Sequence, residues 1–152
     1  MLDALYADLA SEPPPPPHLV STAAPPAFGP GAELADADLR GADMVGADLR
    51  GAVLHRADLR DAQLAGADLT DAQLFAAQLD GADLTGATLD RAMLEEISAE
   101  RTGFTGASLR EAKLSRAQLA HASLGGADLR GADLRGVDGH DARLTGCDLR
   151  GA

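Results

Sequence analysis

Aromatic side chains are nearly absent from this chain, whose 152 residues include three Phe, one Tyr and no Trp. A conventional globular core depends on large side chains, so a core of that kind is not expected. Hydrophobic residues, mostly Ala and Leu, nevertheless make up 45% of the chain, which argues against wholesale disorder. We therefore expect a thin core that is assembled from small repeated units.

Cysteine and long apolar runs are also scarce. The single cysteine, Cys147, excludes an intrachain disulfide and a cysteine-rich metal site. Its place in a small interior position predicts a buried, unreactive thiol. No stretch approaches the ~18 consecutive apolar residues of a transmembrane helix, and the N-terminus lacks the features of a secretory signal. We therefore expect a cytoplasmic protein that does not bind membranes.

Basic residues are outnumbered, with 13 Lys and Arg against 24 Asp and Glu, so the net charge is −11. A strongly acidic chain is repelled by nucleic acid and by anionic membranes, so neither is expected as a direct partner. The acidity favours solubility, and it also suits a basic protein surface, including one that normally holds DNA.

Residues 32–152 consist of one five-residue phrase that is repeated without insertion or deletion. If the central residue of the phrase is called i, then i recurs at every fifth residue from Leu34 to Leu149, and all but four of these 24 positions are Leu. Position i−2 is almost always Ala, and position i+2 is frequently Gly. Neither a helix nor a straight strand brings residues five apart to one side, so the chain must turn once per phrase. Gly at i+2 suits these turns.

This phrase, A-D-L-x-x, closely resembles the pentapeptide-repeat family over residues 32–151. The resemblance implies an all-β fold, a right-handed quadrilateral parallel β-helix of about six coils with four phrases in each coil. Positions i and i−2 then point inward, and the other three positions point outward. Residues 20 positions apart should stack in columns about 4.8 Å apart along the rod.

Two irregular phrases support the inward assignment. Where position i shrinks to Ala99, position i−2 grows to Ile97, and where position i is Gly139, position i−2 is Val137. Such exchanges keep the interior volume nearly constant, as a close-packed core requires. We expect any local bulge to fall in the fourth coil, residues 92–111.

The chain divides into three parts. Residues 1–11 form a short amphipathic segment, residues 12–31 a proline-rich linker, and residues 32–152 the β-helix. The apolar side chains of the first part share one face of a helix, and they are Leu2, Leu5, Tyr6 and Leu9. So short a helix needs a surface to pack on, and it either caps the N-terminal end of the rod or docks on a partner.

The faces of the rod differ in chemistry. One face exposes Val53, Phe75 and Met93, which makes it a candidate protein-binding surface. Another face carries Asp at i−1 beside Arg at i+1, and these should form neutralising ladders. The third and fourth coils carry a band of acids without nearby bases, namely Asp80, Asp83, Asp90, Glu95, Glu96 and Glu100.

The last coil should expose unpaired backbone groups and leucines, which invites association with a second copy or a partner. The residues expected at that contact are Leu134, Leu144 and Leu149.

Catalytic motifs are missing from the sequence. There is no nucleophile–base arrangement, phosphate-binding loop or zinc-ligand spacing, so we expect neither an enzyme nor a cofactor. His121 and Asp141 share a column, with His140 diagonal to both, but exposed His beside Asp is commonly free of metal. No metal site is therefore predicted.

The sequence thus favours a non-enzymatic, acidic, rod-like scaffold that binds another protein. The resemblance supplies an alternative, because some pentapeptide-repeat proteins mimic DNA and bind DNA gyrase, which gives quinolone resistance or self-protection. Two differences between this sequence and the gyrase-binding proteins favour the scaffold. Those proteins carry a C-terminal helical dimerisation module, whereas this sequence stops at Ala152 directly after the last phrase. Arginines at i+1 also interrupt the acidic surface.

Overall fold

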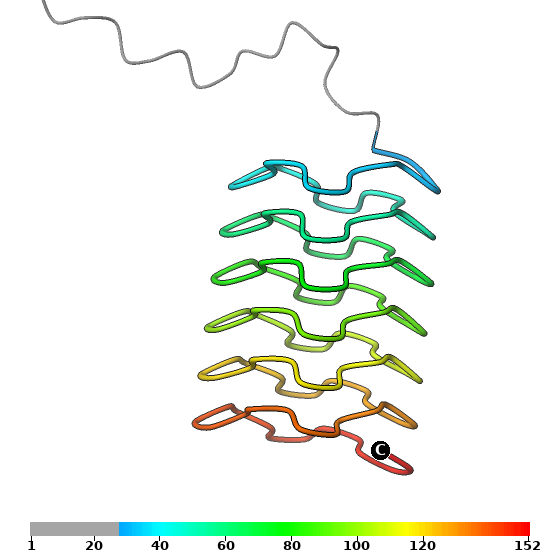
Figure 1. The fold of residues 1–152 in the computed structure, drawn as a ribbon. Coiled ribbons are helices and arrows are strands. Elements are labelled where there is room, and N and C mark those ends of the chain that lie inside the picture. The colour runs from blue at the N-terminus through cyan, green and yellow to red at the C-terminus, as the bar shows by residue number, and fades with distance from the viewer. Residues whose placement is uncertain (1–27) are drawn as a thin grey trace, which may run out of the picture.

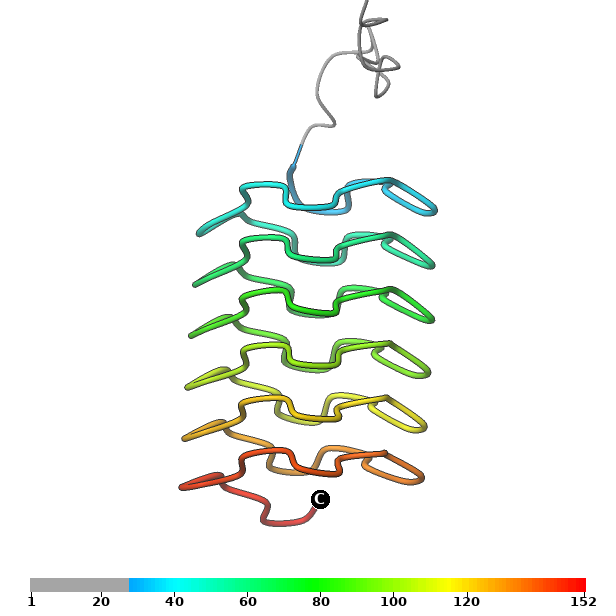
Figure 2. The same cartoon turned by 90° about the vertical axis from the view of Figure 1, so that its left-hand side faces the viewer.

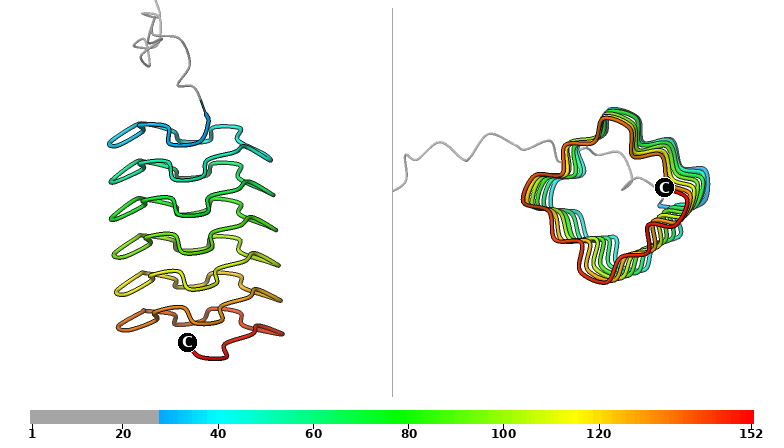
Figure 3. Two further views of the ribbon diagram at one scale, coloured as in Figure 1. Left: turned by 90° about the vertical axis from the view of Figure 1, so that its right-hand side faces the viewer. Right: turned by 90° about the horizontal axis from the view of Figure 1, so that it is seen from below.

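The computed structural model describes residues 28–152, which wind into a stack of four-sided coils (Figure 1). The coils remain evenly spaced along the rod (Figure 2), and they superimpose as a quadrilateral when seen from below (Figure 3). The predicted helix with Leu2, Leu5, Tyr6 and Leu9, together with most of the proline-rich linker, lies outside the described residues.

Single-residue parallel bridges hold neighbouring coils together. They begin with Glu33 pairing with Val53 and end with Asp128 pairing with Asp148, and every bridge joins i−1 residues that lie 20 positions apart. Residues 28–152 contain no helix and no strand longer than such a bridge, and hence no helix that could cross a membrane. The predicted 20-residue coil and its unbroken frame are therefore confirmed, and the β character lies in the pairing pattern.

Hydrogen bonds run in both directions between coils. The N–H of Leu34 donates to the carbonyl of Val53 at 2.8 Å, and the N–H of Val53 donates to the carbonyl of Ala32 at 2.9 Å. Every i+2 residue from Gly31 to Gly151 has a positive φ, whether or not it is glycine. This is the left-handed conformation that the frequent Gly at i+2 predicted.

The core is a stack of Leu at i and Ala at i−2. Both Ile97 and Ala99 are fully buried, which confirms that the two positions share one interior. Thr102 is the one buried polar side chain among the described residues, and its hydroxyl donates to the carbonyl of Leu79 at 2.7 Å. The core thins at the last coil, where Val137 is only partly buried.

The predicted bulge in the fourth coil is wrong. The four bridges that join this coil to the third all keep the 20-residue spacing, and they are Gln73–Met93, Gln78–Ser98, Asp83–Gly103 and Thr88–Ser108. The local changes are confined to two turn bonds. The N–H of Ile97 lacks the bond to the carbonyl of Leu94 that the other phrases make at this position, and the bond from the N–H of Thr102 to the carbonyl of Ala99 is 3.4 Å long. The Ile97 side chain occupies the volume that Ala99 leaves, so the backbone has no reason to loop out.

Candidate protein-binding groove

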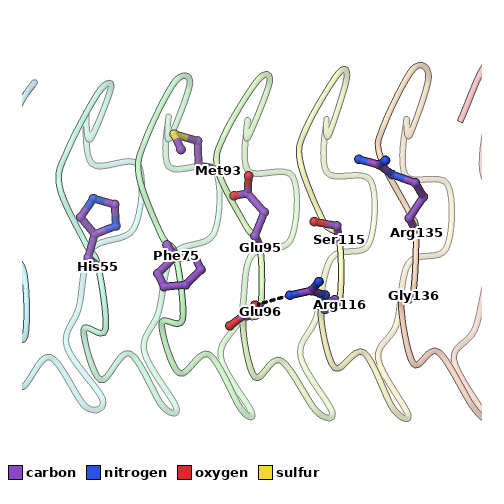
Figure 4. Close-up of a pocket in the computed structure, with 9 residues that line it drawn as sticks. All are labelled: His55, Phe75, Met93, Glu95, Glu96, Ser115, Arg116, Arg135 and Gly136. Carbon is purple, nitrogen blue, oxygen red and sulfur yellow. Dashed lines mark hydrogen bonds and ion pairs between the residues drawn. The ribbon is translucent and has the colours of Figure 1, made fainter.

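One face of the rod is hollowed by a groove of about 630 Å³. It runs along the rod axis across the second to sixth coils (Figure 4). The lining residues are His55, Phe75, Met93, Glu95, Glu96, Ser115, Arg116, Arg135 and Gly136. The repeat positions these side chains, since five of them occupy the i+1 column and therefore stand one coil apart. Because i+1 points outward, their chemistry varies without disturbing the core.

The apolar part of the groove is built by Phe75 and Met93. Phe75 is 39% exposed, which is a large exposed fraction for an aromatic residue. Two of the three predicted interaction residues thus meet in one groove. Val53 is half-buried and lies outside the lining.

The polar part of the groove contains a carboxylate oxygen to which no described residue donates a hydrogen bond. Glu95 Oε2 is buried and has no hydrogen-bond partner among the described residues, and the same is true of His55 Nδ1. The two arginines are already engaged, Arg116 with Glu96 at 3.0 Å and Arg135 with a neighbouring aspartate. A buried, unpartnered polar atom costs about 1–3 kcal/mol. Glu95 is therefore the group that gains most from a cationic ligand.

The acidic band is only partly uncompensated, which corrects the prediction. Glu96 pairs with Arg116, and Glu100 lies 3.5 Å from Arg101. The aspartates of the band accept hydrogen bonds instead, Asp80 from Ser98, Asp83 from Thr85 and Asp90 from Ser108. Glu95 is thus the carboxylate of this band whose Oε2 finds no donor. The stacking of coils brings Arg116 beside Glu96, although the two lie 20 residues apart in the sequence.

The predicted Asp–Arg ladders are present, and their rungs lie on three faces. In each rung the guanidinium of the i+1 arginine binds both oxygens of the i−1 aspartate, as in Asp48–Arg50 with 2.8 and 2.7 Å. The hydrogen bonds of the Arg40 side chain lower the pKa of Asp38 to about 2. Similar rungs join Asp58–Arg60, Asp128–Arg130, Asp133–Arg135 and Asp148–Arg150.

The last coil brings the predicted association residues together. Leu144 is 47% exposed and Leu149 is 42% exposed, and both line an apolar hollow of about 130 Å³ with Leu134. Cys147 is only partly buried, and its Sγ lies 2.7 Å from the carbonyl of Leu124. The thiol is therefore less enclosed than the sequence predicted, because no further coil covers it among the described residues.

The sequence interpretation missed the basic side of the groove. Ser115 and Arg116 were not predicted as site residues, and Arg135 was predicted only as one of the i+1 arginines that interrupt the acidic surface. The signal that could have found them is the 20-residue period itself. Read at that period, the i+1 column runs from His55 through Phe75 and Glu95 to Ser115 and Arg135, so it places an acid between an apolar and a basic side chain.

The pattern of the Pentapeptide repeats family matches eight copies over residues 32–71, 67–102 and 112–151. Rfr23 from the cyanobacterium Cyanothece 51142 is 33% identical, with a TM-score of 0.42 over 64% of this chain and 59% of that chain. HetL from Nostoc sp. strain PCC 7120, involved in regulation of heterocyst differentiation, is 30% identical, with a TM-score of 0.43 over 78% and 70%.

A pentapeptide repeat protein from the Arabidopsis thaliana thylakoid lumen is 29% identical, with a TM-score of 0.44 over 68% of each chain. None of the curated proteins compared with this chain is significantly similar to it. The family pattern covers most of the repeat block, in agreement with the unbroken frame of its coils. The chain belongs to the pentapeptide repeat family.

Proposed function

We propose that this protein is a non-catalytic, protein-binding rod whose groove holds an extended partner segment with an apolar side chain next to a basic one. The observation that carries this proposal is the placement of Phe75 and Met93 beside Glu95, whose buried Oε2 has no partner among the described residues. An apolar anchor would cover Phe75, and a Lys or Arg of the partner would donate to Glu95.

The dimensions of the groove suit a short extended peptide. Three coil steps of about 4.8 Å separate Phe75 from Arg135, or roughly 14 Å. An extended chain rises about 3.3 Å per residue, so some four or five partner residues would lie in the groove. Short linear segments of this length bind through a few anchors, which here are the aromatic ring and the carboxylate.

A peptide library displayed on phage and selected against the full chain tests the proposal. Selected peptides should carry an apolar side chain within one or two residues of Lys or Arg. Their affinity should fall at least tenfold in Phe75→Ala and in Glu95→Gln. Val45→Ala is the matched control, because Val45 is 62% exposed on a different face. Peptides that bind both groove variants as tightly as the unmodified chain would rule out this groove.

Gyrase mimicry is a second candidate, and the net charge of −11 is the observation in its favour. The ladder weighs against it, since Arg50 and Arg130 occupy the aspartates that would stand for phosphates. Arg40 even bridges coils, lying 3.6 Å from Asp58 in the next coil. A gyrase supercoiling assay separates the two functions. The scaffold predicts no inhibition and no protection from quinolones at micromolar protein, and mimicry predicts one or the other.

A further inference from the structure

Two of the three histidines that the structure describes meet at one corner of the rod. His121 belongs to the fifth coil, and His140 and Asp141 belong to the sixth. One ligand atom from each of these three side chains lies within 4.8 Å of the other two, and all three residues are exposed. His121 Nδ1 is 3.8 Å from Asp141 Oδ2, and the two imidazole rings meet edge to face with centroids 5.2 Å apart.

Asp138 orients one of the imidazoles in the way that metal-binding histidines are oriented. Its Oδ1 lies 2.8 Å from His140 Nδ1 and also accepts the backbone N–H of His140 at 3.2 Å. A carboxylate at Nδ1 holds the proton on that nitrogen, so the lone pair of Nε2 is left available. Histidines that ligate metals almost always have a second partner of this kind.

The phrase that carries this cluster differs from others on its face in two ways. The i+1 column of this face varies, reading Arg40, Arg60, Asp80, Glu100, Ala120 and His140, and where Asp38 and Asp58 bind arginines, Asp138 contacts an imidazole. A guanidinium has no lone pair for a metal, whereas an imidazole has one. The phrase also places Gly139 where the core usually has leucine. Val137 stands at i−2 beside it but is only partly buried, so this phrase fills the core less completely than the phrase with Ile97, and departures of this kind are expected at functional sites.

We propose that His121, His140 and Asp141 bind one divalent transition metal ion, with Zn²⁺ the best chemical match. Two imidazole nitrogens and one carboxylate oxygen are typical zinc ligands, whereas Ca²⁺ and Mg²⁺ prefer oxygen alone. Around a tetrahedral ion with bonds of about 2.0–2.2 Å, ligand atoms stand roughly 3.4 Å apart. Side-chain rotations of these exposed residues close the difference from 4.8 Å.

The proposed ion has a structural consequence. Three protein ligands leave a fourth position for water or for a side chain of a partner. The ion would also join the fifth coil to the sixth, where the core is least buried. A ligand that binds only the folded chain raises its stability, so saturating Zn²⁺ should raise the unfolding temperature.

Calorimetric titration of the chelator-treated full chain with ZnCl₂ tests the proposal. One ion should bind per chain, and His121→Ala and His140→Ala should each weaken the affinity at least tenfold. Asp138→Asn, which changes a positioning residue, should weaken it about tenfold, because the carboxylate that orients the His140 imidazole is lost. His55→Ala and Cys147→Ser are the matched controls and should keep the affinity of the unmodified chain.

Two further measurements show whether a variant that fails to bind Zn²⁺ is still folded and whether the ion has few ligands. Circular dichroism of the His121, Asp138 and His140 variants without metal should match that of the unmodified chain, because these side chains are exposed. The Co²⁺-loaded chain should absorb visible light as a low-coordinate ion, and this absorption should disappear in His140→Ala. No saturable binding of Zn²⁺, or equal binding by both histidine variants and the unmodified chain, would overturn the site.

Discussion

At the scale of single residues, the turn position i+2 shows how the repeat tolerates side chains that its backbone disfavours. Twelve non-glycine residues occupy this position with φ between 54° and 61°. The left-handed conformation costs an L-residue roughly 1 kcal/mol or more relative to glycine. The frequent glycines therefore relieve backbone strain, and each other residue at i+2 adds a small cost that the core offsets.

Ala76 and Gly66 allow a matched test of this strain. Both residues have a left-handed φ, 54° at Ala76 and 66° at Gly66, and a methyl group added at Gly66 would meet nothing within 4 Å, so the exchange at Gly66 tests the backbone conformation alone. Ala76→Gly should raise the free energy of unfolding by about 0.5–1 kcal/mol, and Gly66→Ala should lower it by a similar amount. Urea denaturation measures both. Shifts of the same sign in the two variants would contradict the argument.

The Asp–Arg rungs make stability depend on pH at the acid end. Hydrogen bonds from Arg135 lower the pKa of Asp133 to about 2, against roughly 3.9 in an unfolded chain. Because the folded pKa is the lower one, this contribution is fully present above about pH 4 and is lost as pH falls toward 2.

Asp133→Asn removes the titrating group and Arg135→Gln removes its partner, so both should flatten the loss of stability between pH 4 and pH 2. Urea midpoints at pH 7, 4 and 2.5 measure this slope. The Asp133–Arg135 rung would be irrelevant to acid stability if both variants kept the slope of the unmodified chain.

At the scale of the coil, the interior works as one volume shared by positions i and i−2. The fourth coil keeps its bridges although its central leucine is replaced by Ala99, because Ile97 is fully buried beside it. The coil is therefore the unit of packing, and a change at one inward position should be compensated at the other.

Ile97→Ala should lower the free energy of unfolding by about 2–4 kcal/mol, since Ala99 leaves the cavity unfilled. Ala99→Leu alone should cost about 1–3 kcal/mol through overpacking. The double variant restores the regular phrase and should recover more than half of the Ile97→Ala loss. Guanidinium denaturation of all four chains gives the coupling energy. Additive losses would mean that the two positions do not share one space.

The same coil scale explains what was predictable from sequence. The resemblance to the pentapeptide-repeat family implied the coil length and the inward positions, and the strict period revealed the exchange between Ile97 and Ala99. The period stacks Arg116 on Glu96 in the i+2 column, but it did not predict their ion pair, because that contact depends on the rotamers that long side chains adopt. The period did not predict the groove either, because the depth of the groove depends on how Phe75 and Glu95 pack beside the small Ser115.

At the scale of the whole molecule, the two ends of the rod are chemically different. In the fifth coil, the N–H groups of Leu124 and Leu129 donate to carbonyls of the sixth. The matching N–H groups of Leu144 and Leu149 have no acceptor among residues 28–152, so this end is rich in donors. Two such ends facing each other would satisfy few of these donors, so association between them must depend on leucine side chains.

The proposed end-to-end association of the 152-residue chain should therefore be sensitive to a change at Leu149. Leu149 is 42% exposed beside Leu144 at the mouth of the apolar hollow, and a guanidinium there would be buried without a partner. We expect Leu149→Arg to lower the dimer fraction at least tenfold, as measured by sedimentation velocity over a concentration series. Val45→Arg places the same charge on a side face and should leave the dimer intact. A chain that is monomeric at high concentration with or without the Leu149 change would refute this contact and would leave the groove as the candidate interface of the rod.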